Sequence, residues 1–370
     1  MAKYKLGDIC EIVSGSTPKT GIDEYWDGNI KWITPAELND DTYIINDSVR
    51  KITELAVMKT GLSSFPKGTV ILSSRAPIGK VAIAGCEMYC NQGFKNLICS
   101  DKINSKYLYW FLKGNTAYLN SLGRGATFKE ISKRIVSEIE INVPNIEKQE
   151  EVVSTLEKIS EIIALRKKEL RDLDDLIKAR FVEMFGNPVI NEKRWRQKSL
   201  GEITTKIGSG ATPKGGKGAY QEEGITLIRS MNVHNGLFEY RELAHISDEQ
   251  AAKLDNVAIE ENDVLLNITG ASVARSCVVP NKILPARVNQ HVCIIRCKEY
   301  INPVFLNKLL IDDNYQDLLW SVAGAGATRE AITKQQVESL QIIMPPVELQ
   351  NEFMRFCNQV DKSKVVEKNI

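Results

Sequence analysis

Three glycine-rich stretches have the residue types that hold nucleotide phosphates, but their spacing does not fit that role. Each reads G-x-G-A-T, and they lie at Gly123–Thr127, Gly208–Thr212 and Gly324–Thr328. A dinucleotide-binding turn needs a third glycine three residues after the second. Phe128, Pro213 and Arg329 stand there instead, so we expect no dinucleotide at these turns.

Two further nucleotide-binding patterns are incomplete. The segment before Lys217 lacks a P-loop, because Ala211 replaces its first glycine and Gly218 replaces the Ser or Thr that would hold Mg²⁺. The run Met344-Pro345-Pro346 lacks the asparagine and the aromatic ring of a loop that holds a flipped adenine. We therefore expect that the chain binds no cofactor and is not an enzyme by itself.

The cysteines and histidines do not have metal-ligand spacing. Cys86 and Cys90, like Cys293 and Cys297, are separated by three residues rather than two. His291 is one of only three histidines in the chain. We expect no metal site, and buried, reduced thiols instead.

The glycine stretches can instead start helices. Thr127 and Glu130 have the spacing of a capping box for a helix around Ile131–Ser137, and Thr328 could cap similarly without the acidic partner. Alternatively, each helix start could receive an anionic phosphate. The cations that would assist are Arg124, Lys129 and Arg329.

The residues from Lys193 to Lys217 form a basic stretch, with seven basic residues against one acidic residue. Its glycine-rich tip, Gly215–Gly218, predicts a flexible loop. Lys214 and Lys217 would contact phosphates from this loop, or the loop would be solvated without a partner.

All these residues are positioned by a unit that occurs twice. Seven sets of residues recur in the same order about 200 positions later. They are Leu6–Ile9 with Leu200–Ile203, Ser14–Lys19 with Ser209–Lys214, Val70–Ser73 with Val264–Asn267, Asn91–Gly93 with Asn289–His291, Gly125–Thr127 with Gly326–Thr328, Ile131–Lys133 with Ile332–Lys334, and Pro144–Gln149 with Pro345–Gln350. We infer a tandem duplication.

Each copy begins with a compact α+β module, at 1–145 and 187–345. Short apolar runs separated by Gly, Pro and Asn predict strands at 69–73, 80–84 and 263–267. Helices are expected at 105–113 and 303–311.

Each copy ends in a helix, at 146–186 and, in a shorter form, at 346–370. No Pro or Gly occurs between Glu147 and Phe185, and Gly186-Asn187-Pro188 is a stop signal. Apolar residues at spacings of three, four or seven predict a coiled-coil seam. The seam residues are Val152, Leu156, Ile159, Ile163, Leu170, Leu173 and Ile177 in the first helix, and Leu349, Phe353, Phe356 and Val360 in the second.

Two like units can bury two like seams by pairing the helices antiparallel around a pseudo-two-fold axis. The helices would then hold two similar modules several tens of ångströms apart. One turn of B-DNA is about 34 Å, so such a pair could present two readers to DNA.

The whole chain resembles the specificity subunits of type I restriction–modification systems. The resemblance rests on Leu6–Ile9 with Ser16-Thr17-Pro18, on Gly125–Thr127 with Ile131, and on Pro144 with Glu147–Gln149, all of which recur. It implies two target-recognition domains, each reading half of a bipartite, asymmetric DNA site, joined by two antiparallel spacer helices. The implied partners are double-stranded DNA, two methyltransferase subunits that carry S-adenosylmethionine and, where the system has them, restriction subunits.

Base recognition requires Arg for guanine and Asn or Gln for adenine, on loops that differ between the two copies. We select Arg75 and Lys80 in the loop 73–80, and Thr269 and Arg275 in the loop 267–275. The further candidates for DNA binding are Thr17, Lys19, Asn91, Gln92, Arg229, Asn232, His234, Asn289 and Gln290. Because Asn-Gln occurs in both copies, we expect it to serve structure or phosphate binding.

Composition leaves two other functions open. Lys and Arg number 48 against 47 Asp and Glu, so no global basic character marks a nucleic-acid binder. The alternatives are a specificity component of a related two-gene restriction–methylation system and a duplicated protein-interaction scaffold without DNA. The absence of a long apolar run and of a secretory signal predicts a cytoplasmic protein with no membrane contact.

Overall fold

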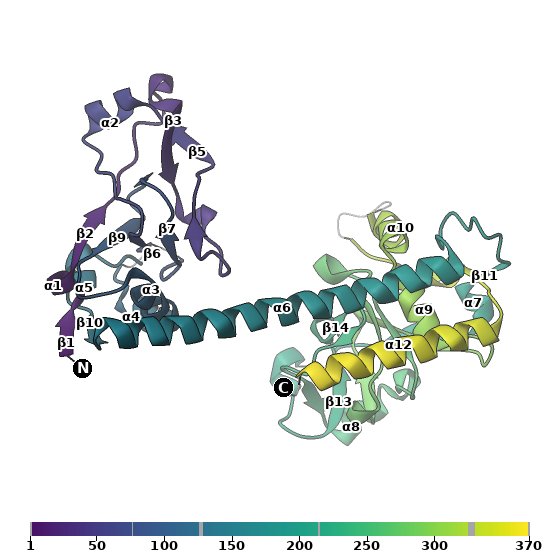
Figure 1. Cartoon of the computed structure of the whole chain (residues 1–370). Helices are drawn as coiled ribbons and strands as arrows, with labels where there is room; N and C mark the ends of the chain where they lie inside the picture. The colour runs from purple at the N-terminus through teal and green to yellow at the C-terminus, as the bar shows by residue number, and fades with distance from the viewer. Residues whose placement is uncertain (1, 76, 126–128, 214, 325–329, 369–370) are drawn as a thin grey trace. The chain divides into compact units, whose positions relative to one another are not determined.

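The chain forms two compact units, Met1–Leu165 (unit 1) and Arg166–Ile370 (unit 2) (Figure 1). The computed structural model describes residues 2–75, 77–125, 129–213, 215–324 and 330–368. Thr127, Lys214, Thr328 and Arg329 therefore lie outside the described residues, as does the side chain of Lys217. No helix in the described part of the chain is long and apolar enough to cross a membrane.

Unit 1 contains a five-stranded sheet, a three-stranded sheet and a separate strand pair (Figure 1). The large sheet has the order β2 (Cys10–Ser14), β9 (Phe94–Cys99), β6 (Val70–Ser73), β7 (Val81–Ala84) and β4 (Ile44–Ile45). The small sheet has the order β5 (Arg50–Ile52), β3 (Trp26–Ile33) and β8 (Tyr89–Cys90). The pair is β1 (Ala2–Lys5) with β10 (Glu140–Val143).

Unit 2 contains the same arrangement, with a four-stranded large sheet. Its order is β12 (Thr204–Ser209), β20 (Val292–Cys297), β17 (Val264–Asn267) and β18 (Ser276–Val278). The small sheet has β16 (Ala244–Ile246), β13 (Ile225–Ile228) and β19 (Ala286–Val288), and the pair is β11 (Gln197–Ser199) with β21 (Gln341–Ile343). A short hairpin, β14 (Val233–His234) with β15 (Leu237–Phe238), belongs to unit 2.

The pairing confirms the duplication. In both small sheets the central strand, β3 or β13, pairs antiparallel on one side and parallel on the other. In both large sheets the register is equivalent, because Leu72 faces Lys95 where Leu266 faces Cys293. The expected α+β class and the two similar modules are therefore confirmed.

Short helices cover the sheets in both units. In unit 1 they are α1 (Leu6–Ile9), α2 (Glu54–Thr60), α3 (Ser105–Gly114), α4 (Thr116–Leu122) and α5 (Lys133–Ser137). In unit 2 they are α7 (Leu200–Ile203), α8 (Asp248–Ala252), α9 (Pro303–Leu310), α10 (Asp313–Gly324) and α11 (Lys334–Ser339). The helices α3 and α9 pack on equivalent strands and start at asparagine caps, Asn104 and Asn302. An asparagine is favoured there because its side chain accepts a free backbone N–H.

The expected caps of α5 and α11 were wrong. Ser132 caps α5, since its hydroxyl accepts a hydrogen bond from the Ile135 amide at 3.3 Å. Thr333 caps α11 in a capping box with Gln336. The side chain of Glu130 instead binds Arg75 of a neighbouring loop and Lys95 of β9. The repeated Ile-Ser-Lys and Ile-Thr-Lys motifs thus carry the helix starts.

Two long helices complete the fold, α6 (Ile146–Phe185) and α12 (Val347–Lys368). The helix α6 ends at Gly186, whose φ of +75° lies in the left-handed region and whose amide donates to Val182 O at 2.8 Å. The ammonium group of Lys193 donates to the carbonyl of Glu183 and so satisfies the last turn. The long helix expected from the sequence is therefore present.

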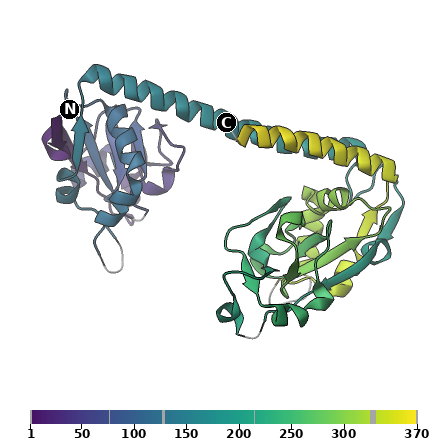
Figure 2. The same cartoon turned by 90° about the horizontal axis from the view of Figure 1, so that it is seen from below.

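Within unit 2, α12 runs antiparallel along the C-terminal part of α6 (Figure 2). Lys364 binds Asp174 at 2.6 Å and Glu352 binds Arg180 at 3.0 Å, so the contacts run in opposite chain directions. Phe353 packs edge-on against Phe181, with ring centroids 5.5 Å apart. The seam residues of this region are buried or packed on the core, namely Leu173, Ile177, Leu349, Phe353, Phe356 and Val360.

The seam prediction was wrong for the middle of α6. Val152, Leu156 and Leu170 are half-buried, but Ile159 and Ile163 are 47% and 50% exposed. The described ion pairs along α12 extend only to Lys364 and Asp174. The spacing of apolar residues therefore continues along α6 beyond the part that α12 covers.

A buried glutamine fixes the first turn of each long helix to its unit. The Gln149 amide accepts from Asn104 N at 2.8 Å and donates to Lys102 O at 3.0 Å and Pro144 O at 2.9 Å. Gln350 makes the equivalent three bonds, to Asn302 N, Tyr300 O and Pro345 O. Both glutamines are fully buried, which explains their place in the repeat.

Candidate functional site

In unit 1 a glycine turn crosses the connection between β8 and β9. Gly15 leaves no room for a side chain, because a Cβ there would lie 2.2 Å from Asn91 O. Ser16 N donates to Cys90 O at 3.0 Å, and the Thr17 hydroxyl donates to the Gln92 side chain. The repeated Ser-Gly-x-Thr-Pro motif is thus bound to the repeated Asn-Gln motif.

Unit 2 repeats this crossing. A Cβ on Gly210 would lie 1.7 Å from Val288 O, and Gly210 N donates to Asn289 O at 3.1 Å. The Thr212 hydroxyl donates to the Gln290 side chain. Asn289 is buried and accepts a bond from its own loop, at His291 N. Asn91 accepts likewise from Gly93 N, so the asparagines shape the loops.

In unit 1 the hairpin loop between β6 and β7 lies directly beside this crossing. Ser74 N donates to Gly93 O at 2.7 Å and Ile131 N donates to Ser74 O at 2.9 Å. The next residue, Arg75, forms an ion pair with Glu130 at 2.9 Å, and Glu130 also contacts Lys95 at 3.4 Å. We call Thr17, Arg75, Gln92, Lys95 and Glu130 cluster 1.

In unit 2 the loop between β17 and β18 takes the same position. Ile268 N donates to His291 O at 3.0 Å and Ile332 N donates to Ile268 O at 2.8 Å. The Thr269 hydroxyl lies 2.5 Å from His291 Nδ1, and Gln290 Nε2 lies 3.0 Å from His291 Nε2. We call Thr212, Thr269, Gln290 and His291 cluster 2.

Sequence reasoning missed four members of these clusters. Thr212 is the repeat partner of Thr17, and this equivalence could have identified it. His291 was considered only as a metal ligand, and Glu130 only as a cap. No signal in the sequence marked Lys95, because its role depends on the register of β9 against β6.

Several sequence candidates are held by contacts within their own unit. The Lys80 ammonium donates to the carbonyls of Leu38 at 2.5 Å and Pro35 at 3.4 Å. Asn232 is fully buried and holds its turn through Arg229 N and Glu239 O. These side chains shape the loops.

Two arginines of unit 2 have contacts near the β14–β15 hairpin. The Arg229 guanidinium donates to the carbonyl of Glu242 and lies over the Tyr220 ring. Arg275 lies 3.5 Å from His234 Nδ1. This region is separate from the hydrogen bonds that join cluster 2.

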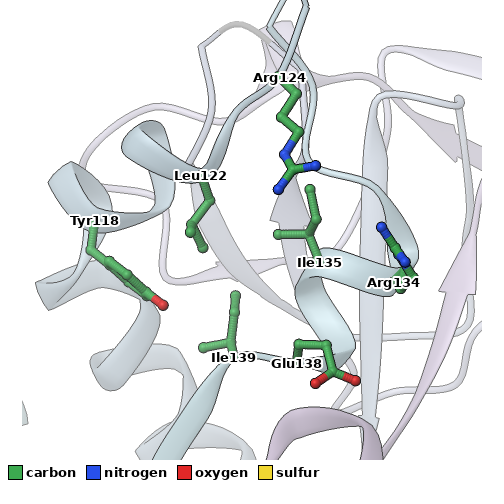
Figure 3. A pocket seen from close by; sticks show the side chains of 7 residues that line it. All are labelled: Tyr118, Leu122, Arg124, Arg134, Ile135, Glu138 and Ile139. Carbon is green, nitrogen blue, oxygen red and sulfur yellow. The ribbon is translucent and has the colours of Figure 1, made fainter.

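Arg124 extends over a cavity of about 420 Å³ in unit 1 (Figure 3). Leu122, Ile135 and Ile139 form its apolar wall, and Glu138 binds Lys5 at 2.6 Å. The repeat partner of Ile135 in unit 2 is Gln336, whose amide reaches Val322 O at 3.3 Å. Lys19 and Lys129 are exposed.

Two cysteines near these loops are buried. Burial raises the pKa of the Cys293 thiol to about 12, so the thiol stays protonated near neutral pH. Burial also raises the pKa of Cys90 to about 12. Among the described residues no group of three or more His, Cys, Asp or Glu side chains is arranged to hold a metal ion.

Comparisons with known proteins agree with this duplicated architecture. The family described as type I restriction modification DNA specificity domain matches residues 1–174 and again 192–370. The MjaIX specificity subunit of Methanocaldococcus jannaschii is 33% identical over 94% of this chain and 84% of its own length. The MjaVIII specificity subunit of the same organism is 21% identical over 96% and 85%.

Solved structures show the same fold. A chain from a type I R-M system covers 100% of this chain and 92% of its own, with a TM-score of 0.58 at 18% identity. The S subunit of a type I restriction–modification system from M. genitalium covers 100% and 91%, with a TM-score of 0.54 at 14% identity. The chain therefore belongs to the family of type I restriction–modification DNA specificity proteins, with two copies of the family's domain.

Proposed function

We propose that each unit reads one half of a bipartite DNA site, unit 1 through cluster 1 and unit 2 through cluster 2. One observation carries this proposal. The two clusters have the same backbone contacts but different side chains: Arg75, Glu130 and Gly93 in unit 1 stand where Thr269, Ala331 and His291 stand in unit 2. Two domains that read different half-sites need the same backbone arrangement, which positions them on DNA, and different polar side chains, which contact different bases.

We assign the shared and the divergent residues to different tasks. The Thr17–Gln92 and Thr212–Gln290 pairs hold the loops in place, so we assign them to positioning on the backbone of DNA. The exposed cations Lys19 and Lys129 suit phosphate contacts. The divergent residues, led by Arg75 in unit 1 and Thr269 with His291 in unit 2, would contact base edges.

We infer that the chain acts as a scaffold without catalytic chemistry of its own. Specificity subunits of type I systems assemble with methylase and restriction subunits and bind DNA. A chain with two like units offers each docking surface twice, so two methyltransferase subunits fit it. Residues 1–145 and 187–345 would be the target-recognition domains, and 146–186 and 346–370 the spacers.

Methylome sequencing of cells that carry this chain with its genetic neighbours tests the proposal. We expect a split adenine-methylation motif. Replacement of residues 187–345 by the equivalent part of a relative should change one half of the motif and leave the other half unchanged. A motif that is continuous, or that changes in both halves, would contradict it.

A further inference from the structure

Arg75 is held by a carboxylate that is itself held by a buried cation. Arg75 Nε lies 2.9 Å from Glu130 Oε2, and Lys95 Nζ lies 3.4 Å from Glu130 Oε1. The Lys95 side chain is only 8% exposed, and its ammonium group also contacts Ser74 Oγ and Phe94 O. The two carboxylate oxygens thus face different cations.

This ion pair orients the guanidinium group through Nε and leaves its two Nη groups without a partner among the described residues. The Arg75 side chain is 45% exposed. Two N–H donors in a fixed fork therefore face away from Glu130.

We propose that Arg75 reads a guanine in the major groove of the half-site that unit 1 recognises, with Glu130 as its positioning residue. The proposal rests on the proposed function. Guanine presents two adjacent acceptors, O6 and N7, and a bidentate arginine is the commonest contact to that pair. A guanidinium group oriented in this way makes such a contact selective, because its donors turn less freely to fit another base.

The orientation of the Arg75 guanidinium group distinguishes a base contact from a phosphate contact. A phosphate contact depends on positive charge, which Glu130 partly neutralises. The whole arrangement is also confined to one unit. At the equivalent positions unit 2 has Thr269 for Arg75, Cys293 for Lys95 and Ala331 for Glu130. A general phosphate contact would be expected in both units, whereas a base-reading group is expected to differ.

The first test is the methylation motif of cells with the complete system carrying Arg75→Lys. Lysine keeps the charge but loses the fork. We expect one guanine of one half-site to become degenerate, while the other half stays unchanged. Arg134→Gln, which removes another exposed arginine of unit 1, is the matched control and should keep the motif. Loss of methylation at all sites with an unaltered motif would identify a phosphate contact and overturn the proposal.

The second test uses the purified complex and duplexes with a modified guanine at that position. Replacement by 7-deazaguanine removes N7, one of the two acceptors, and should weaken binding by the wild type by less than the roughly 140-fold that a whole bidentate pair can be worth. It should weaken binding by the Arg75→Lys variant less than binding by the wild type. Inosine keeps O6 and N7 and should bind like guanine. If the wild type ignores 7-deazaguanine, or neither half-site contains guanine, the proposal fails while the split motif, and with it the proposed function, can stand.

Glu130→Gln separates positioning from folding. The variant keeps an acceptor for Arg75 but loses the ion pairs. We expect discrimination to weaken at the same guanine alone. A lower melting temperature with unchanged base discrimination would show that Glu130 is structural only, and would overturn its role as positioning residue.

Discussion

At the scale of single residues, the repeated polar side chains have two different tasks. Thr17 with Gln92 and Thr212 with Gln290 bind one another across the chain crossing. Gln149 and Gln350 are buried and fix the helix starts. A residue that recurs in both units therefore supports the frame, and discrimination depends on the residues that differ.

The Gln149 anchor gives a prediction at this scale. Gln149→Met should lower the free energy of unfolding of unit 1 by about 2–4 kcal/mol, because Asn104 N, Lys102 O and Pro144 O lose their partner in a buried site. Urea unfolding measures the change. Glu150→Ala, at an exposed neighbouring position, should change it by less than about 0.5 kcal/mol. Equal effects of the two substitutions would show that the amide is dispensable.

At the scale of elements, the sequence predicted those parts that depend on local spacing. The helix α6, the strands β6, β7 and β17, and the helices α3 and α9 were predicted within about two residues, since caps, breakers and apolar runs are local signals. The middle of the seam was not, because Ile159 and Ile163 have the right spacing whether or not a partner helix reaches them.

The site was predicted less well for a related physical reason. Arg75 and Thr269 were chosen from their loops, and both lie in the clusters. Lys80 was chosen on the same grounds, but its ammonium group donates to two backbone carbonyls. Whether a cation is free or bound depends on which strands pair, and strand pairing is not visible in loop sequence.

The contact between α12 and α6 yields the next prediction. Phe353 is fully buried and its ring packs on Phe181 and Phe185. Phe353→Ala should lower the free energy of unfolding of unit 2 by about 3–5 kcal/mol, through lost burial and the cavity left behind. Calorimetry should show the unit 2 transition at a lower temperature. Arg355→Ala, on the exposed side of the same helix, should leave it in place; a shift as large as that of Phe353→Ala would contradict this packing.

Hydrogen bonds to the carboxylate of Glu157 hold the N-terminal part of α6 against the rest of unit 1. Burial alone would raise the pKa of Glu157, but hydrogen bonds from Lys106 at 2.8 Å and Tyr43 at 2.6 Å outweigh it and hold the pKa below its ordinary value of 4.5. A lowered pKa in the folded state means that the carboxylate stabilises the fold above about pH 4.5 and that this stability is lost as the pH falls through the lowered value.

Thermal unfolding against pH checks this expectation. Glu157→Gln should melt at a lower temperature than the wild type at pH 7, and the difference should shrink as the pH falls below about 4.5. Glu161→Gln, one turn further along α6, is the control for the loss of an exposed charge and should show no such trend. A difference that stays constant from pH 7 down to about pH 3 would rule out the ionised carboxylate as the group that holds this part of α6.

At the scale of the whole molecule, charge is the unusual property of this DNA reader. The formal net charge is only +1, whereas affinity for DNA usually depends on many phosphate contacts. Many of its cations are also paired internally, such as Arg296 with the buried Asp263 and Arg180 with Glu352. We therefore infer that partner subunits supply much of the positive surface around the DNA.

This inference predicts how binding depends on salt. The chain alone should bind a duplex with its site only in the range of about 10⁻⁴–10⁻⁶ M near physiological salt, and should lose that affinity further as salt rises. Addition of the methyltransferase subunits should tighten binding at every salt concentration. It should also steepen the slope of log K against log salt, by about 0.9 for each phosphate newly contacted.

A duplex with both half-sites scrambled separates this charge effect from base reading, because only the intact site should gain affinity from contacts by clusters 1 and 2. Nanomolar binding by the chain alone that is insensitive to salt would mean that the two units bind DNA tightly by themselves. It would contradict the inference that partner subunits supply much of the positive surface.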